Sequence, residues 1–147
     1  MGRTTLETGN SKLGSPGRPA KKQIKDFTDL NNWSLARNLR KTVYDFTKRF
    51  PADEKHVLVA QFRRAAISVT ANLAEGFGRY SYRENVQFCR HARGSLHELR
   101  DHLTTALDAG YLSQGEWKQV DDLAQRVAKL LNGYIRSTQN LQKRKDS

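Results

Sequence analysis

Apolar residues recur at three- and four-residue steps through four long segments of this chain. This is the spacing of helices that bury one face. The clearest example lies in the second segment, at Phe62, Ala65, Ala66, Val69 and Leu73. β-branched residues neither cluster nor alternate with polar ones, so the sequence predicts no strand. Four amphipathic helices joined by short links favour an all-α, antiparallel up-down-up-down four-helix bundle.

Proline and glycine indicate where the first two helices end. The first helix is predicted over residues 29–50, because Pro51 lacks an N–H group and disfavours helical geometry in the residue before it. The second helix is expected to begin just after Pro51 and to end near Glu75. Gly76 and Gly78 follow, and we expect them to adopt the left-handed conformation that ends many helices.

Two capping boxes mark the start of the remaining helices. Residues 81–84 read Ser-Tyr-Arg-Glu and residues 113–116 read Ser-Gln-Gly-Glu, the pattern in which serine and glutamate cap each other's backbone N–H groups. Gly110 is expected to stop the third helix. The fourth helix is predicted to run to about Leu141.

The charge of the chain points to a polyanionic partner. The 147 residues suit one domain and carry a net charge of +11. Residues 1–25 hold six Lys or Arg and one acid among glycines and prolines, which predicts a flexible basic N-terminal arm. Residues 26–142 form the expected bundle, and residues 143–147 a basic C-terminal tail. A solvated surface is the alternative interpretation of this charge.

The sequence contains no recognisable arrangement of catalytic or metal-ligating residues. The single cysteine, Cys89, excludes an internal disulfide and falls in a helical pattern that predicts burial. Glu98 and His102 are one turn apart, but without a third ligand we interpret them as a surface pair. We therefore expect no metal and no cofactor. No apolar run approaches the about 20 residues of a membrane span, and we expect a cytoplasmic protein.

Basic residues recur on the predicted helices and are candidates for binding phosphate. Near the turn after the second helix, Tyr80 and Tyr82 are candidates for stacking on an unpaired base, with exposed loop tyrosines as the alternative. The candidate nucleic-acid-binding residues are Arg37, Arg40, Lys41, Arg63, Arg64, Arg79, Arg83, Arg90 and Arg93, together with Arg18, Lys21 and Lys22 of the arm.

A second set of polar residues lies on the second and third helices. We favour a structural polar network between these helices over direct ligand contact, because buried polar groups must be hydrogen-bonded to be tolerated. Gly94 lies in the middle of the predicted third helix, where glycine costs roughly 1 kcal/mol against alanine. We therefore expect another backbone to lie close to Gly94, with Ala71 and Ala74 facing it. The network residues are Ser68, Asn72, Glu75, Gly94, Ser95 and Glu98.

Several motifs in this order resemble a known family. They include Gln61-Phe62-Arg63-Arg64-Ala65-Ala66, Asn72-Leu73-Ala74-Glu75-Gly76-Phe77-Gly78-Arg79 and Ala92-Arg93-Gly94-Ser95-Leu96. Over about residues 27–135 the chain resembles the four-helix bundle family of proteins encoded in intervening sequences of bacterial 23S rRNA genes. The accessory variability proteins of diversity-generating retroelements are more distant relatives. The resemblance implies a homopentamer, and in the retroelement relatives a basic surface that binds structured RNA or DNA and a reverse transcriptase.

These observations favour a non-enzymatic, homo-oligomeric protein that binds nucleic acid, RNA rather than DNA, through its basic surface. The resemblance adds an accessory role to a reverse transcriptase or another ribonucleoprotein. A protein–protein scaffold, whose charge serves docking of the partner, is the alternative from a different functional class.

Overall fold

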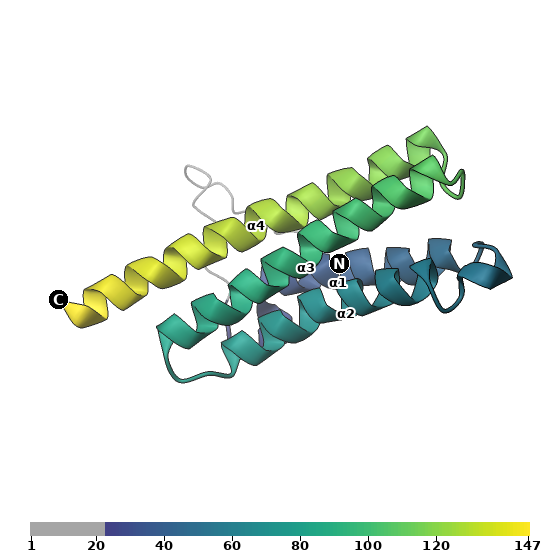
Figure 1. Cartoon of the computed structure of the whole chain (residues 1–147). Coiled ribbons are helices and arrows are strands. Elements are labelled where there is room, and N and C mark those ends of the chain that lie inside the picture. Colours follow the sequence, from purple (N-terminus) through teal and green to yellow (C-terminus); the bar gives the residue numbers. More distant parts are fainter. Residues whose placement is uncertain (1–22) are drawn as a thin grey trace, which may run out of the picture.

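The computed structural model describes residues 23–147, which form four long helices and two short 3₁₀ helices (Figure 1). No strand occurs within this range. The long helices are α1 (Asn31–Thr47), α2 (Leu58–Phe77), α3 (Tyr82–Asp108) and α4 (Gln114–Asp146), and the 3₁₀ helices are η2 (Phe27–Asp29) and η3 (Ala52–Glu54).

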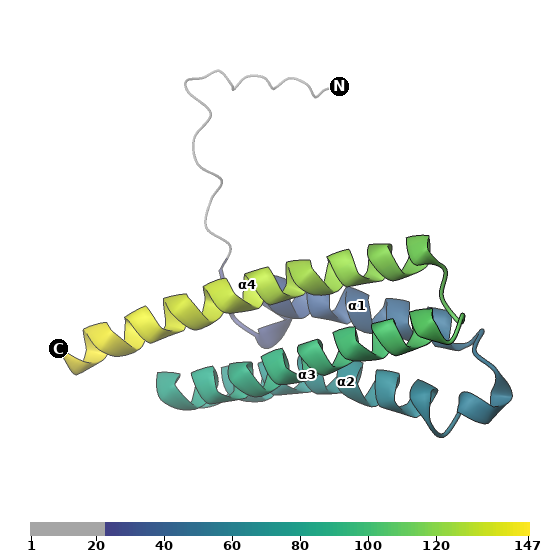
Figure 2. The same ribbon diagram turned by 45° about the horizontal axis from the view of Figure 1, so that its top comes forward.

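Successive helices run in opposite directions and pack side by side (Figures 1 and 2). Helices α1 and α3 do not pack on each other directly; each of them packs on both α2 and α4. The predicted all-α bundle of four helices is therefore confirmed.

The apolar stripes of the four helices meet in one core. Phe46, Phe50 and Phe62 form an aromatic cluster with ring centroids 5.1–5.9 Å apart, and Phe62 is fully buried. Burying an aromatic side chain of this size contributes about 1.5–3 kcal/mol. Leu130 of α4 is 40% exposed, because its neighbour Leu131 occupies the buried position on that turn.

Both capping serines act as predicted, but the predicted box is reciprocal only at residues 113–116, because the Glu84 side chain does not bond the Ser81 N–H. The Ser81 hydroxyl accepts a hydrogen bond from the Glu84 backbone N–H at 3.0 Å, and α3 begins at the next residue. Ser113 and Glu116 form the complete reciprocal box at the start of α4. Each cap satisfies backbone donors that have no partner inside the helix.

The first two helices differ from their predicted limits. Helix α1 ends at Thr47 rather than at Phe50, and α2 begins at Leu58 rather than just after Pro51. The intervening chain forms the short helix η3, and Val57 then adopts a non-helical conformation with φ −115° and ψ −95°. Helix propensity does not decide the conformation of the residues between α1 and α2, because the backbone must turn there before α2 can pack against α1.

Helix α4 continues beyond its predicted end near Leu141 and runs to Asp146. Lys143, Arg144 and Lys145 therefore lie in its last turn. Cations at this end of a helix are favoured by the partial negative charge of the free carbonyl groups. The basic residues near the C-terminus are thus arranged on a helix beside α3.

Gly76 and Gly78 do not adopt the left-handed conformation that was expected of them. Neither Gly76 nor Gly78 has a positive φ, and in the described range Gly110 is the glycine that does, at +79°. A Cβ on Gly76 would lie 2.7 Å from Asn85 Oδ1 and 2.9 Å from the Cβ of Phe88. Gly76 is therefore needed for the close approach of α3 to α2.

The expectation that another backbone approaches Gly94 is wrong. A Cβ on this residue would meet no atom of the described chain within 4 Å, and Gly94 is exposed. Ala71, one of the two residues expected to face it, is also exposed. The close contact between α2 and α3 lies instead near the start of α3, because Gly76 and Asn85 meet there.

A small buried network extends from that contact to α4. The Asn85 amide donates to the hydroxyl of Tyr134 at 3.0 Å and accepts a hydrogen bond from the Cys89 thiol at 3.6 Å. Cys89 is fully buried, as predicted, and burial raises the pKa of its thiol to about 11. Burial also raises the pKa of Tyr134. Both groups are therefore neutral and act as packing and hydrogen-bonding residues.

A mostly buried ion pair joins α3 to α4 farther along the bundle. Arg100 donates from Nε and Nη2 to the two carboxylate oxygens of Asp121, at 2.8 and 3.2 Å. Gln125 donates to the same carboxylate at 2.8 Å. Asp121 is only 6% exposed, and hydrogen bonds from Arg100 hold the pKa of its carboxyl below the usual value.

Candidate nucleic-acid interface

Two of the candidate arginines are engaged within the bundle. Arg63 donates from Nε to the Thr47 hydroxyl at 3.1 Å, and its guanidinium lies 4.6 Å from the centre of the Tyr44 ring. Arg64 donates to the side chains of Gln61 and Glu98. These contacts connect α2 to α1 and α3, so both side chains have partners that a phosphate would have to displace.

Arg79 is the cationic partner of Glu75, a residue of the expected polar network. It forms an ion pair with Glu75 at 2.7 Å and lies 3.7 Å from Glu84, while its guanidinium is 4.7 Å from the centre of the Phe88 ring. Two acids and an aromatic face therefore surround this arginine at the turn between α2 and α3. Its charge is largely compensated by neighbours.

The expected polar network divides into two groups between α2 and α3. Ser68 and Ser95 share a hydrogen bond of 2.7 Å between their hydroxyl groups, and the Asn72 amide donates to Ser68 Oγ at 3.0 Å. Glu98 belongs to a second, charged group, in which it contacts His102 at 3.2 Å as well as Arg64. Glu75 and Gly94 take part in neither group.

The candidate cluster on α1 is partly neutralised. Arg40 donates to the Thr70 hydroxyl at 2.8 Å, and the Arg37 guanidinium lies 5.9 Å from the Trp33 ring. Lys41 and Arg40 line a shallow pocket that Asp45 also lines. The acid reduces the attraction that this surface exerts on phosphate.

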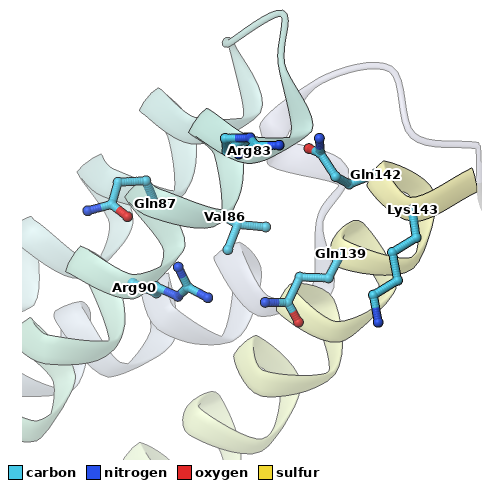
Figure 3. A pocket seen from close by; sticks show the side chains of 7 residues that line it. All are labelled: Arg83, Val86, Gln87, Arg90, Gln139, Gln142 and Lys143. Carbon is cyan, nitrogen blue, oxygen red and sulfur yellow. The ribbon is translucent and has the colours of Figure 1, made fainter. Parts of the chain in front are cut away.

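The remaining candidates line a groove between α3 and α4. Two adjoining pockets, of about 310 and 400 Å³, share Arg90 and Gln139. We name their combined lining the α3–α4 groove. Figure 3 shows the first pocket, in which Arg90 of α3 and Gln139 of α4 approach each other across the gap and Val86 lies between the helices. The groove is lined by Arg83, Val86, Gln87, Arg90, Arg93, Asn132, Ile135, Arg136, Gln139, Gln142 and Lys143.

Five of these side chains are cationic, and no residue lining the groove is acidic. Arg90, Arg136 and Lys143 have no side-chain hydrogen bond or ion pair within residues 23–147. Arg83 is 4.0 Å from Asp146, near the limit of an ion pair, and Arg93 donates to Asn132 at 3.0 Å. Uncompensated like charges held on two packed helices create a local positive potential that favours an anion.

Helical periodicity places the groove residues on two facing stripes. On α3, Arg83, Gln87 and Arg90 follow one another at steps of four and three residues, which keeps them on one face. On α4, Arg136, Gln139 and Lys143 do the same at steps of three and four. The α4 stripe was missed in the sequence, although its spacing is the same signal.

Three candidates, Arg18, Lys21 and Lys22, lie outside the described residues. Within residues 23–147 no group of three or more His, Cys, Asp and Glu side chains is arranged to hold a metal ion. In the same part of the chain, no helix combines the length and apolarity needed to cross a bilayer.

Comparison with known proteins identifies the family. Residues 28–133 match the model of the 23S rRNA-intervening sequence protein family. The fold is similar to a crystal structure of a protein of unknown function from the S23 ribosomal protein family of Bacteroides thetaiotaomicron. The TM-score is 0.55 at 21% identity, over 72% of this chain and 93% of that one. No curated protein matches the chain. Because the family model spans most of the bundle, this chain belongs to the 23S rRNA-intervening sequence protein family.

Proposed function

We propose that this chain is a non-enzymatic nucleic-acid-binding protein that holds the phosphates of a structured RNA in the α3–α4 groove. The observation that carries the proposal is the set of five cations on two facing helices, with no acid among the lining residues. Phosphate contacts supply most of the affinity of such surfaces by releasing counterions from the nucleic acid. Amide side chains between the cations add hydrogen bonds to phosphate and sugar.

RNA is the preferred partner for two reasons. The family that the chain belongs to is described by intervening sequences of 23S rRNA, which associates it with genes for a structured RNA. The groove also lies between two helices and has apolar residues among its lining, which suits the irregular loops of folded RNA better than a regular duplex. A reverse transcriptase or another ribonucleoprotein component would then be a second partner, as the resemblance to retroelement accessory proteins implies.

The proposed binding unit is a homopentamer, as the family resemblance implies. Residues 26–142 hold 17 basic and 13 acidic residues, a net charge of +4. Five such bundles would carry about +20 in one ring, which strengthens the field on a polyanion without any new side chain. Sedimentation equilibrium of the full chain is expected to give a mass of five subunits. A mass of one subunit at micromolar concentration would contradict this part of the proposal.

The groove itself is tested by neutralising two of its unpaired cations. Arg90→Gln with Arg136→Gln is expected to weaken binding of a folded RNA hairpin by about tenfold or more. It should also reduce the dependence of log K on log salt by about 2, because two phosphate contacts are lost. The measurement is fluorescence anisotropy between about 50 and 200 mM salt.

A matched control removes the same charge elsewhere. Arg126 and Lys129 are exposed residues of α4 that do not line the groove. Arg126→Gln with Lys129→Gln is expected to cause a clearly smaller loss. Equal losses in the two double variants would mean that overall charge, and not the groove, binds RNA. An RNA affinity that does not change with salt concentration would favour the alternative function, a protein–protein scaffold. A complex with a partner protein that survives nuclease treatment would also support the scaffold.

A further inference from the structure

We infer that the α3–α4 groove takes unpaired nucleotides, with their phosphates on the arginines and a base between the helices. This inference rests on the proposed function and names the part of the RNA that enters the site. It depends on three features of the groove: its apolar floor, its unengaged amide, and the exposed tyrosine at the neighbouring turn.

The floor of the groove is apolar although its rim is charged. Val86 is 5% exposed and lies between the two helices, and Ile135 has the same exposure on the α4 side. A phosphate gains nothing from an apolar floor, whereas the face of a base does. In a double helix the base faces are stacked and covered, so only an unpaired base presents its face to Val86.

The amide of Gln139 is placed to contact the edge of such a base. It lines both pockets beside Arg90, and its side chain makes no hydrogen bond within the described residues. A carboxamide offers a donor and an acceptor together, which matches the adjacent donor and acceptor on a base edge. Gln142, by contrast, donates to Asp146 at 3.1 Å. Within residues 23–147 Gln87 is also without a side-chain hydrogen bond, but it lines the first pocket alone, so Gln139 is the unengaged glutamine that both pockets share.

An exposed aromatic residue precedes the Arg83 end of the groove in the sequence. Tyr80 is fully exposed in the turn between α2 and α3, three residues before Arg83. Exposing a whole tyrosine ring to water has no structural benefit. Base–aromatic stacking is the contact that tyrosine supplies in proteins that bind single strands. The turn therefore extends the nucleotide site beyond the pocket itself.

The experiment compares three RNA probes at the same salt concentration. They are an oligouridine and an oligoadenosine of about 12 nucleotides, and a blunt RNA duplex of the same length. The full chain is used throughout, so the contribution of residues 1–25 is constant. At least one single strand is expected to bind about tenfold or more tightly than the duplex.

Two variants connect that preference to the groove. Gln139→Leu is expected to weaken single-strand binding about fivefold or more without changing the salt dependence, because no phosphate contact is lost. Tyr80→Ala is expected to cause a similar loss. Gln119→Leu, at an exposed position of α4 outside the groove, is the matched control and should bind as the wild type does.

The outcomes separate this inference from the proposed function. Equal affinity for strand and duplex, with Gln139→Leu indistinguishable from Gln119→Leu, would overturn the inference. The proposed function would still stand if Arg90→Gln with Arg136→Gln weakened binding of every probe. If no RNA is bound by the wild type, both the proposed function and this inference fail.

Discussion

Replacing Arg100 with methionine is expected to lower the free energy of unfolding by about 3 kcal/mol. The change leaves the carboxylate of Asp121, which is 6% exposed, with Gln125 as its remaining partner. A buried charge without a counter-ion is among the costliest defects a core can carry. The value is at the lower end of the usual range, because the Arg100 side chain is one-third exposed and its charge is partly screened.

The loss is expected to depend on pH. Arg100 keeps the pKa of Asp121 below its unfolded value of about 3.9, so the stabilisation is fully present above that value. It is lost as the pH falls through the lower pKa of the folded state. Urea unfolding should therefore show a larger difference between wild type and variant at about pH 7 than at about pH 3.

A second substitution provides the control. Arg100→Met combined with Asp121→Leu removes both charges and is expected to recover most of the stability, since an apolar pair of similar volume can replace a buried ion pair. Equal urea midpoints for the single variant and the wild type would show that the pair contributes nothing. A double variant no more stable than the single one would show that packing, and not charge, is lost.

Replacing Gly76 with valine is expected to lower the free energy of unfolding by about 2–3 kcal/mol. The new Cβ would lie 2.9 Å from the Cβ of Phe88 and 2.7 Å from Asn85 Oδ1. Asn85 cannot simply turn away, because its amide also bonds to Tyr134 and accepts from Cys89. The substitution therefore pushes α2 and α3 apart, and thermal unfolding by circular dichroism measures the result.

Gly94→Ala is the matched control on the neighbouring helix. Its Cβ would enter open space, so the variant is expected to gain about 0.5–1 kcal/mol from the better helix propensity of alanine. If Gly76→Val were as stable as the wild type, the contact between α2 and α3 would have to be looser than described. Destabilisation by Gly94→Ala would indicate a contact with another subunit at that face.

The fold could be predicted from local signals where these act alone. Ser81 and Ser113 cap their helices within a few residues, so both starts could be read directly. Gly76 could not be interpreted in this way. A glycine near the end of a helix fits either a left-handed terminus or a close helix contact, and only the position of Asn85, across the turn on α3, distinguishes them. The start of α2 likewise depends on how η3 packs.

The site was only half predictable for a similar reason. Arg90 and Arg93 were recognised as candidates because they lie one turn apart on one predicted helix, and Arg83 because it flanks the turn before that helix. Their counterparts Arg136 and Lys143 belong to a helix more than forty residues later. The register between α3 and α4 places them opposite each other, and no local pattern contains that register. The paired arginines of α2 show the converse, since their partners on other helices, Thr47 for Arg63 and Glu98 for Arg64, could not be assigned from local sequence.

The length of α4 has a consequence for how the groove responds to an occupant. Thr138 is the last buried residue of this helix, so the turns that carry Gln139, Gln142 and Lys143 have no anchor in the core. Such turns open locally at small free-energy cost. The C-terminal end of the α4 wall is thus expected to open more readily than the turns that carry Ile135 and Thr138, and an occupant would order it. Amide hydrogens of these turns are then the ones whose exchange with solvent slows most when the groove is filled.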